Sequence, residues 1–188
     1  MLAALLIPAW AFATPCAAIR AAFPCWPGAA PAWLAALHGF AWLRDLSASA
    51  TRADGAPIAE AVVRHWLGVH GETVGEPAWP ADNTGWRILF WASHAPLILS
   101  SSDLVYRSAV LNHLARAARH LDRVADKTQP GTGQMVAWVG IVAASLLMPG
   151  GEPRQVFGEA GLRKVLETSF YADGGNISRS PQAQLSQK

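Results

Sequence analysis

Apolar residues recur at every third or fourth position along most of the chain, which is the spacing of one face of an α-helix. On this pattern we predict six helices, at about residues 32–47, 58–69, 83–99, 103–124, 134–148 and 154–170. No segment shows the alternation of apolar and polar residues that is typical of a half-buried strand. The sequence therefore predicts an all-α protein.

Proline and glycine residues mark where these helices end or bend. Gly71 is expected to end the second helix, Pro96 to kink the third, and Ser102 to cap the fourth. Because the connections are short, we expect antiparallel helix hairpins stacked side by side in a curved array. No repeat of fixed period is present, which argues against a consensus solenoid.

Two of the helices carry specific predictions about burial. The helix at 134–148 is apolar nearly all round, so we expect it to be buried on several sides. The helix at 103–124 is expected to bury one apolar row, made of Leu104, Leu111, Leu114, Ala118 and Leu121.

The first 30 residues differ from the rest because they are rich in alanine and proline, which rules out one long helix. We predict an irregular segment at 1–30 and a helical domain at 31–188. Residues 1–13 are apolar, but they lack a basic start and Pro8 interrupts them, which argues against a signal peptide. No run of about 20 apolar residues is present, so no membrane span is expected.

Composition narrows the function classes. A chain of 188 residues is long enough for one domain with a sizeable core. Its net charge of +2 is too small to indicate a nucleic-acid partner. Cys16 and Cys25 could form a disulfide in an oxidising compartment, but two cysteines are too few for a zinc site. No metal and no cofactor are expected.

The first candidate for chemistry is a group on the third predicted helix. Arg87, Trp91 and His94 are spaced by four and three residues, which places them on one helix face. Arginine offers a planar cation for a carboxylate, tryptophan a surface for a sugar ring, and histidine a proton near neutral pH. These are the groups that a groove for an acidic sugar needs. The alternative is that Trp91 and His94 pack against a neighbouring helix while Arg87 pairs at the surface.

The second candidate is a basic row on the helix at 103–124. It contains Arg116, Arg119 or His120, and Arg123, with His113 one turn earlier. Such a row can bind an anionic chain, but it is also typical of a solvated helix face.

The third candidate is the loop at residues 173–185. The Asp173-Gly174-Gly175 turn leads to Ser180-Pro181, a pair that is typical of a helix start. Between them, Asn176 and Arg179 are able to bind sugar hydroxyls or to neutralise a carboxylate. The alternative is an ordinary turn between helices.

This loop also resembles the D-G-G-H-x-x-R-S/N-P segment of bacterial heparinase II/III-like polysaccharide lyases. Residues 37–46, 118–121 and 147–152 resemble further segments of the same family, in the same order. The resemblance implies an incomplete (α/α) toroid, truncated at its C-terminus and lacking the family's C-terminal β-sandwich domain as a partner. It also implies the cell envelope or periplasm as the location, with the cytoplasm as the alternative.

The family's reaction is β-elimination on acidic, uronate-containing polysaccharide. A base removes the C5 proton of the uronate, and an acid, often tyrosine, protonates the departing oxygen. Active family members tend to carry an Asn-His pair where this chain reads Thr132-Gly133-Gln134, and their catalytic tyrosine lies beyond the Asp-Gly-Gly segment. No catalytic residue is therefore assigned, and weak or no activity is expected from this chain alone.

Two other functions compete with a lyase. One is a non-catalytic helical scaffold that docks a protein partner, and the other is a sugar-binding module. A concave cleft lined by Arg87, Trp91 and His94 would favour sugar binding, whereas burial of Trp91 between helices would favour the scaffold.

Overall fold

The computed structural model describes residues 31–171, and this part of the chain is helical with no β-strand. The predicted all-α class is therefore confirmed. The elements are α2 (Pro31–His38), α3 (Trp42–Ser49), α4 (Arg52–His70), α5 (Ala81–Ser93), α6 (Ala95–Ile98), α7 (Leu104–Val124), the short 3-10 helix η2 (Ala125–Lys127), α8 (Thr132–Leu147) and α9 (Glu152–Ser169).

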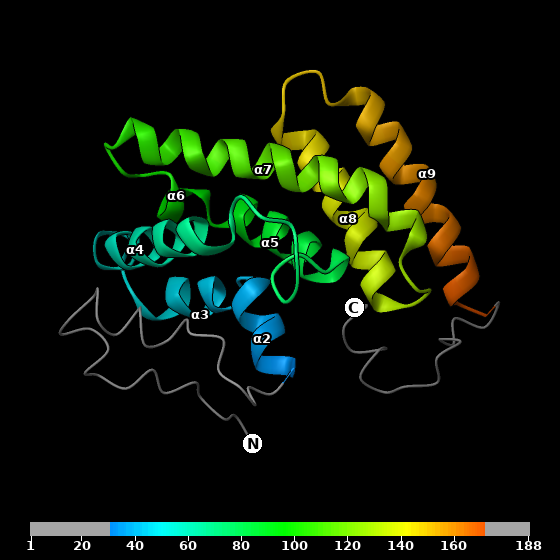
Figure 1. The fold of residues 1–188 in the computed structure, drawn as a ribbon, viewed down its shortest axis with the longest axis horizontal. Helices are drawn as coiled ribbons and strands as arrows, with labels where there is room; N and C mark the ends of the chain where they lie inside the picture. The colour runs from blue at the N-terminus through cyan, green and yellow to red at the C-terminus, as the bar shows by residue number, and fades with distance from the viewer. Residues whose placement is uncertain (1–30, 172–188) are drawn as a thin grey trace.

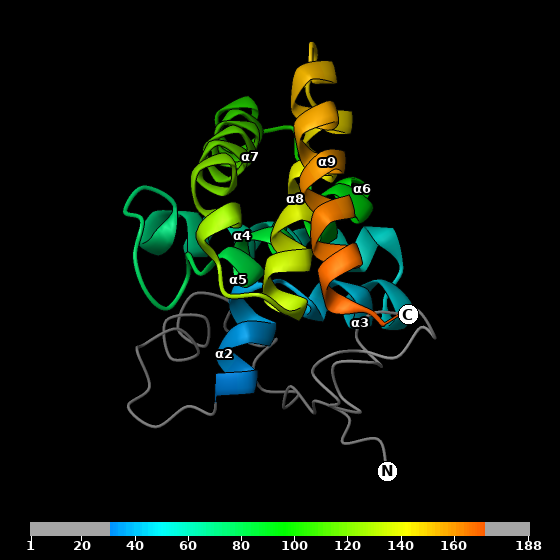
Figure 2. The same cartoon turned by 90° about the vertical axis from the view of Figure 1, so that its right-hand side faces the viewer.

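Helix α8 packs against both α5 and α9. Helix α7 lies above α4 and α5 and reaches α8 (Figure 1). Viewed at right angles, α8 and α9 stand side by side, and α2 lies below α5 (Figure 2). Whether the helices belong to a toroid stays a prediction.

Two glycines allow the close contact between α5 and α8. A Cβ atom added to Gly140 would lie 2.7 Å from the Cα of Gly85, and one added to Gly85 would lie 2.4 Å from the carbonyl oxygen of Val136. Real Cβ atoms do not approach other atoms this closely, so the two backbones touch only because both positions lack a side chain.

The first predicted helix is wrong as a single element, because the chain breaks between α2 and α3. Phe40 adopts a φ of 63°, which a residue with a side chain rarely does. Its ring is fully buried and packs edge-on against Trp66 and Trp91. These core contacts stabilise a backbone conformation that the sequence pattern does not indicate.

Two other predicted helix starts need correction. Helix α4 begins six residues earlier than predicted, because the Thr51 side chain accepts a hydrogen bond from the Asp54 amide and caps the helix. The cap of α7 is Asp103 and not Ser102, since its Oδ1 accepts hydrogen bonds from two backbone amides at 2.9 and 3.2 Å. The third predicted helix, expected to kink at Pro96, is instead divided into two, because α5 ends at Ser93 and α6 begins at Ala95.

The predicted burial of α7 is correct in its second half only. Leu114, Ala118 and Leu121 are buried, but Leu104 and Leu111 are 72% and 53% exposed. In the first half, the inward face of α7 instead carries the buried Tyr106, Val110 and His113. Helix α8 is buried over most of its length, as predicted, although Leu146 and Leu147 at its end are exposed.

A search of residues 31–171 finds no helix whose length and apolar character would let it cross a membrane.

The glycine contact leads to a stability prediction. We expect Gly85→Ala to lower the free energy of unfolding by about 1–3 kcal/mol, because the added Cβ must displace the backbone of α8. Gly68→Ala is the matched control, since nothing lies within 4 Å of its Cβ position, and we expect it to be neutral or stabilising. Urea unfolding followed by circular dichroism measures both; equal effects of the two changes would contradict this account of the contact.

Candidate functional site

Arg87, on the inward face of α5, is the centre of the polar structure inside the helical body. Its side chain has no exposed surface. Its nitrogens donate four hydrogen bonds, which go to His113 Nε2 (3.1 Å), the His38 carbonyl (3.0 Å), the Ala78 carbonyl (2.9 Å) and Thr84 Oγ1 (3.3 Å). One guanidinium therefore connects α5 with α7, with the end of α2 and with the loop between α4 and α5.

The same guanidinium lies between two indole rings. Its Cζ is 4.5 Å from the ring centroid of Trp66 and 5.2 Å from that of Trp79. Cation–π attraction strengthens when water is excluded. Within residues 31–171 no carboxylate pairs with Arg87, and burial lowers its pKa to about 9, so it remains charged at neutral pH.

The expectation that Arg87, Trp91 and His94 look together into an open groove is wrong. Arg87 is enclosed by α2, α4, α5 and α7, and Trp91 is 2% exposed because Phe40, Trp66 and His113 surround it. The packing alternative holds for Trp91, but Arg87 does not pair at the surface.

His94 lies apart from this cluster. It follows the last residue of α5, its Nδ1 donates a hydrogen bond of 2.9 Å to the Phe90 carbonyl, and its ring stacks on that of Phe90. The three residues are thus not brought together as a binding surface.

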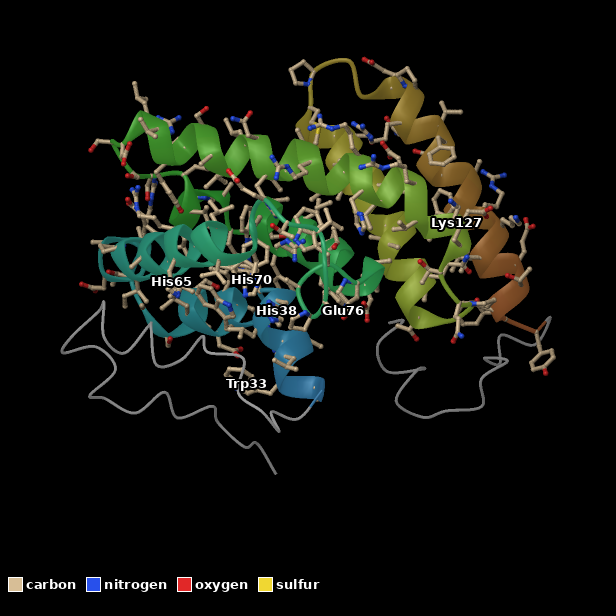
Figure 3. The ribbon with its side chains drawn as sticks, viewed as in Figure 1. Trp33, His38, His65, His70, Glu76 and Lys127 are labelled. Atoms are coloured by element: carbon tan, nitrogen blue, oxygen red, sulfur yellow. The ribbon has the colours of Figure 1, made fainter. Side chains whose placement is uncertain are left out.

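Histidines that lie close to Arg87 are held in the neutral form. The pKa of His38 is lowered to about 4, first by burial and then by the charges of His70 and Arg87. Burial and then Arg87 also lower the pKa values of His70 and, more strongly, of His113. Figure 3 shows His38 and His70 near each other, from α2 and α4, and their ring centroids are 5.0 Å apart.

The loop at residues 71–80 is held to the helices mainly through its backbone. Side chains of α5 and α7 donate to its carbonyl oxygens: Arg116 to Gly71 and Glu72, Asn83 to Pro77, Arg87 to Ala78, and His120 to Trp79. In addition, Trp79 Nε1 donates to the His70 carbonyl at 2.8 Å. These bonds fix the path of a segment that has no regular secondary structure for most of its length.

An open pocket of about 560 Å³ lies where this loop meets the end of α7 and the start of α8. We call it the α7–α8 pocket. It is lined by Trp79, Pro80, Ala81, Asp82, His120, Val124, Lys127, Thr128, Gln129, Pro130, Gly131, Thr132 and Gly133. Lys127 is exposed and lies at the far side of the molecule from His38 and His70 (Figure 3).

Sequence reasoning missed Asp82 and Lys127 as candidates. The signal in the sequence was that each of them lies near a proline, Pro80 or Pro130, that marks a helix boundary. Such boundaries leave space that side chains do not fill.

The predicted basic row on α7 does not form one surface. His113 is buried against Arg87, and Arg116 and His120 hold the 71–80 loop. Arg119 and Arg123 are exposed, as the solvated-face alternative predicts. Asn176, Arg179, Cys16 and Cys25 lie outside the described residues.

Comparison with known proteins returned no match to a family model, to a curated protein or to a solved structure.

The histidine cluster predicts acid sensitivity. In the unfolded chain these histidines bind protons near pH 6.5, but in the folded protein His38 does so only near pH 4. The unfolded state therefore binds more protons, and stability is expected to fall as the pH falls from about 6.5 toward 4.

Urea unfolding at pH 7.5, 6 and 5 measures this effect. His38→Gln is the test variant, since its amide can still accept from Trp66 Nε1, which bonds His38 Nδ1 at 3.1 Å. We expect a weaker pH dependence in this variant than in the unchanged protein. Equal stability of the unchanged protein at all three pH values would show that the histidines are not held neutral.

Proposed function

We propose that this chain forms the N-terminal helical part of a heparinase II/III-like polysaccharide lyase. In this proposal, residues 31–171 bind acidic, uronate-containing polysaccharide at the α7–α8 pocket. The location of the pocket is the observation that carries the proposal. Its wall includes Thr132 and Gly133, at the start of α8, where the family resemblance places the Asn-His pair of active lyases.

The lining of the pocket suits a polar, negatively charged ligand. The ammonium group of Lys127 can pair with a uronate carboxylate, and Thr132 and His120 offer hydrogen-bonding groups for sugar hydroxyls. Asp82 works against an anion at its own end of the pocket, so the carboxylate is expected at the Lys127 end. Arg87 and Trp91 are not part of the proposed binding surface, because both are buried.

The proposal assigns binding, and no chemical step, to the described residues. Elimination needs a base for the C5 proton and an acid for the departing oxygen, while the C4–O bond breaks and a C4–C5 double bond forms. Thr132-Gly133-Gln134 supplies no imidazole. Tyr106 is buried, and the Cζ of Arg64 lies 4.5 Å from the centroid of the Tyr106 ring. Burial raises the pKa of the Tyr106 hydroxyl. It is therefore not placed to act as the acid.

A charge reversal at the pocket tests the proposal. We expect Lys127→Glu to weaken binding of a polyuronate oligosaccharide about tenfold or more, because an ion pair with the carboxylate is replaced by repulsion. Arg107→Glu is the matched control, since it makes the same charge change at an exposed residue in the first half of α7 and Arg107 does not line the pocket. Titration calorimetry with oligomers of galacturonate, glucuronate, mannuronate and guluronate measures the affinities.

The outcomes separate the candidate functions. Equal weakening by both variants would show a general charge effect and contradict the pocket. Binding with an ultraviolet signal from an unsaturated uronate product would favour the lyase over a sugar-binding module, whereas binding alone fits both. Failure of every uronate oligomer to bind would remove the polysaccharide proposal.

The second candidate is a non-catalytic helical scaffold, and two observations favour it. The burial of Trp91 between helices is the result that the scaffold predicts. Helix α9 also exposes Val156, Phe157 and Leu166, at 70%, 45% and 39% exposure, and Leu146 near the end of α8 is 70% exposed. A partner that covers some of these apolar side chains would stabilise the protein without any sugar.

A further inference from the structure

One wall of the α7–α8 pocket depends on contacts with groups that do not line it. This wall is the segment from Trp79 to Asp82, where the 71–80 loop leads into α5. The start of α5 is not capped by a side chain, and most of the preceding loop lacks regular secondary structure. The position of the wall therefore depends on the hydrogen bonds that hold the loop, which come from Asn83, Arg116 and His120 and, from the core, from Arg87.

Arg87 is the group that reaches the loop from the core. One nitrogen of its guanidinium donates both to the Ala78 carbonyl at 2.9 Å and to the His38 carbonyl at 3.0 Å. The residue before the wall is thus tied to the end of α2 through a single atom. Because Arg87 is fully buried, water does not compete for these bonds.

Trp79 extends this connection into the pocket. Its ring lies against the guanidinium of Arg87, its Nε1 donates to the His70 carbonyl, and its own carbonyl accepts from His120 Nε2 at 3.0 Å. Trp79 and His120 both line the pocket, whereas Arg87 does not. Asp82 also lies directly beside the start of α8, because a Cβ added to Gly133 would be 3.5 Å from the Cβ of Asp82, so a shift of the wall would change the surroundings of Gly133.

We propose that Arg87 is a positioning residue for the α7–α8 pocket, which holds the wall at Trp79 and Asp82 in place through Ala78 and the Trp79 ring. The uronate ligand rests on the proposed function, but the geometry of the wall does not. The rival account is that Arg87 only stabilises the core.

Guanidinium rescue distinguishes the two accounts. In Arg87→Ala the space between the two indoles and the carbonyl acceptors stay available, so millimolar guanidinium can occupy them. Guanidinium bound in this space would also restore lost stability, so the distinguishing readout is the wall itself: only a positioning role predicts that the wall signals of the folded variant shift and then recover. The full chain, labelled with 5-fluorotryptophan and with ¹⁵N, gives separate signals for the Trp79 ring and for the Asp82 and Gly133 amides. Trp79→Phe assigns the ring signal.

We expect Arg87→Ala to shift or broaden all three signals and to weaken uronate binding about tenfold, with guanidinium restoring both. Val110→Ala is the control, because Val110 is buried on α7 and does not line the pocket, so it loses stability without moving the wall. A folded Arg87→Ala protein with unchanged Asp82 and Gly133 amides, or with no recovery in guanidinium, would overturn the proposal.

If Arg87→Ala does not fold, Arg87→Lys tests whether Arg87 positions the wall. Lysine keeps a buried cation but lacks the planar set of donors that reaches His113, Ala78 and His38 together. We expect a folded protein whose Asp82 and Gly133 amides still shift, and unchanged amides would overturn the proposal. If no uronate binds even to the unchanged protein, the polysaccharide proposal fails, while the amide and ring signals still decide the role of Arg87.

Discussion

The structure depends on a positive charge that is buried without a negative partner among residues 31–171. Removing a guanidinium from water is costly, and an unpaired buried charge is ordinarily neutralised or excluded. Here four hydrogen bonds and two indole faces replace the lost hydration of Arg87. Its acceptors are carbonyls, a hydroxyl and an imidazole, so the charge is spread over dipoles instead of being cancelled.

The buried charge of Arg87 requires that the surrounding histidines stay uncharged. Burial disfavours a charge on these imidazoles, and repulsion from Arg87 adds to it, so the pKa values of His38, His70 and His113 are lowered. The Arg87 contacts bind α2, α4, α5 and α7 together, and the glycine contact then joins α5 to α8. The α7–α8 pocket lies beside this junction and takes its walls from both parts.

Periodicity predicted the helices whose stability comes from a simple apolar face. The ranges of α8 and α9 were close to correct, since Pro130-Gly131 and Pro149-Gly150-Gly151 stop the chain where the pattern stops. The break at Phe40 was not predictable, because it depends on rings contributed by Trp66 and Trp91. Spacing correctly placed Arg87 and Trp91 on one face, but it could not tell that the face points inward. The partners of Arg87 come from residues 38, 78 and 113, and two of them are backbone atoms, which no pattern of side chains reveals.

Arg87 donates to both backbone and side-chain acceptors, and this difference affects which of the residues around it can be replaced in related chains. Carbonyl oxygens are the same in every amino acid, so the bonds at residues 38 and 78 survive many replacements there. Thr84 and His113 contribute through their side chains, and a replacement at either position removes one of the four hydrogen bonds that replace the hydration of Arg87. Among related chains, residues 84, 87 and 113 are therefore expected to change together or not at all, whereas at residue 78 the burial of the Ala78 side chain, and not its bond to Arg87, limits replacement.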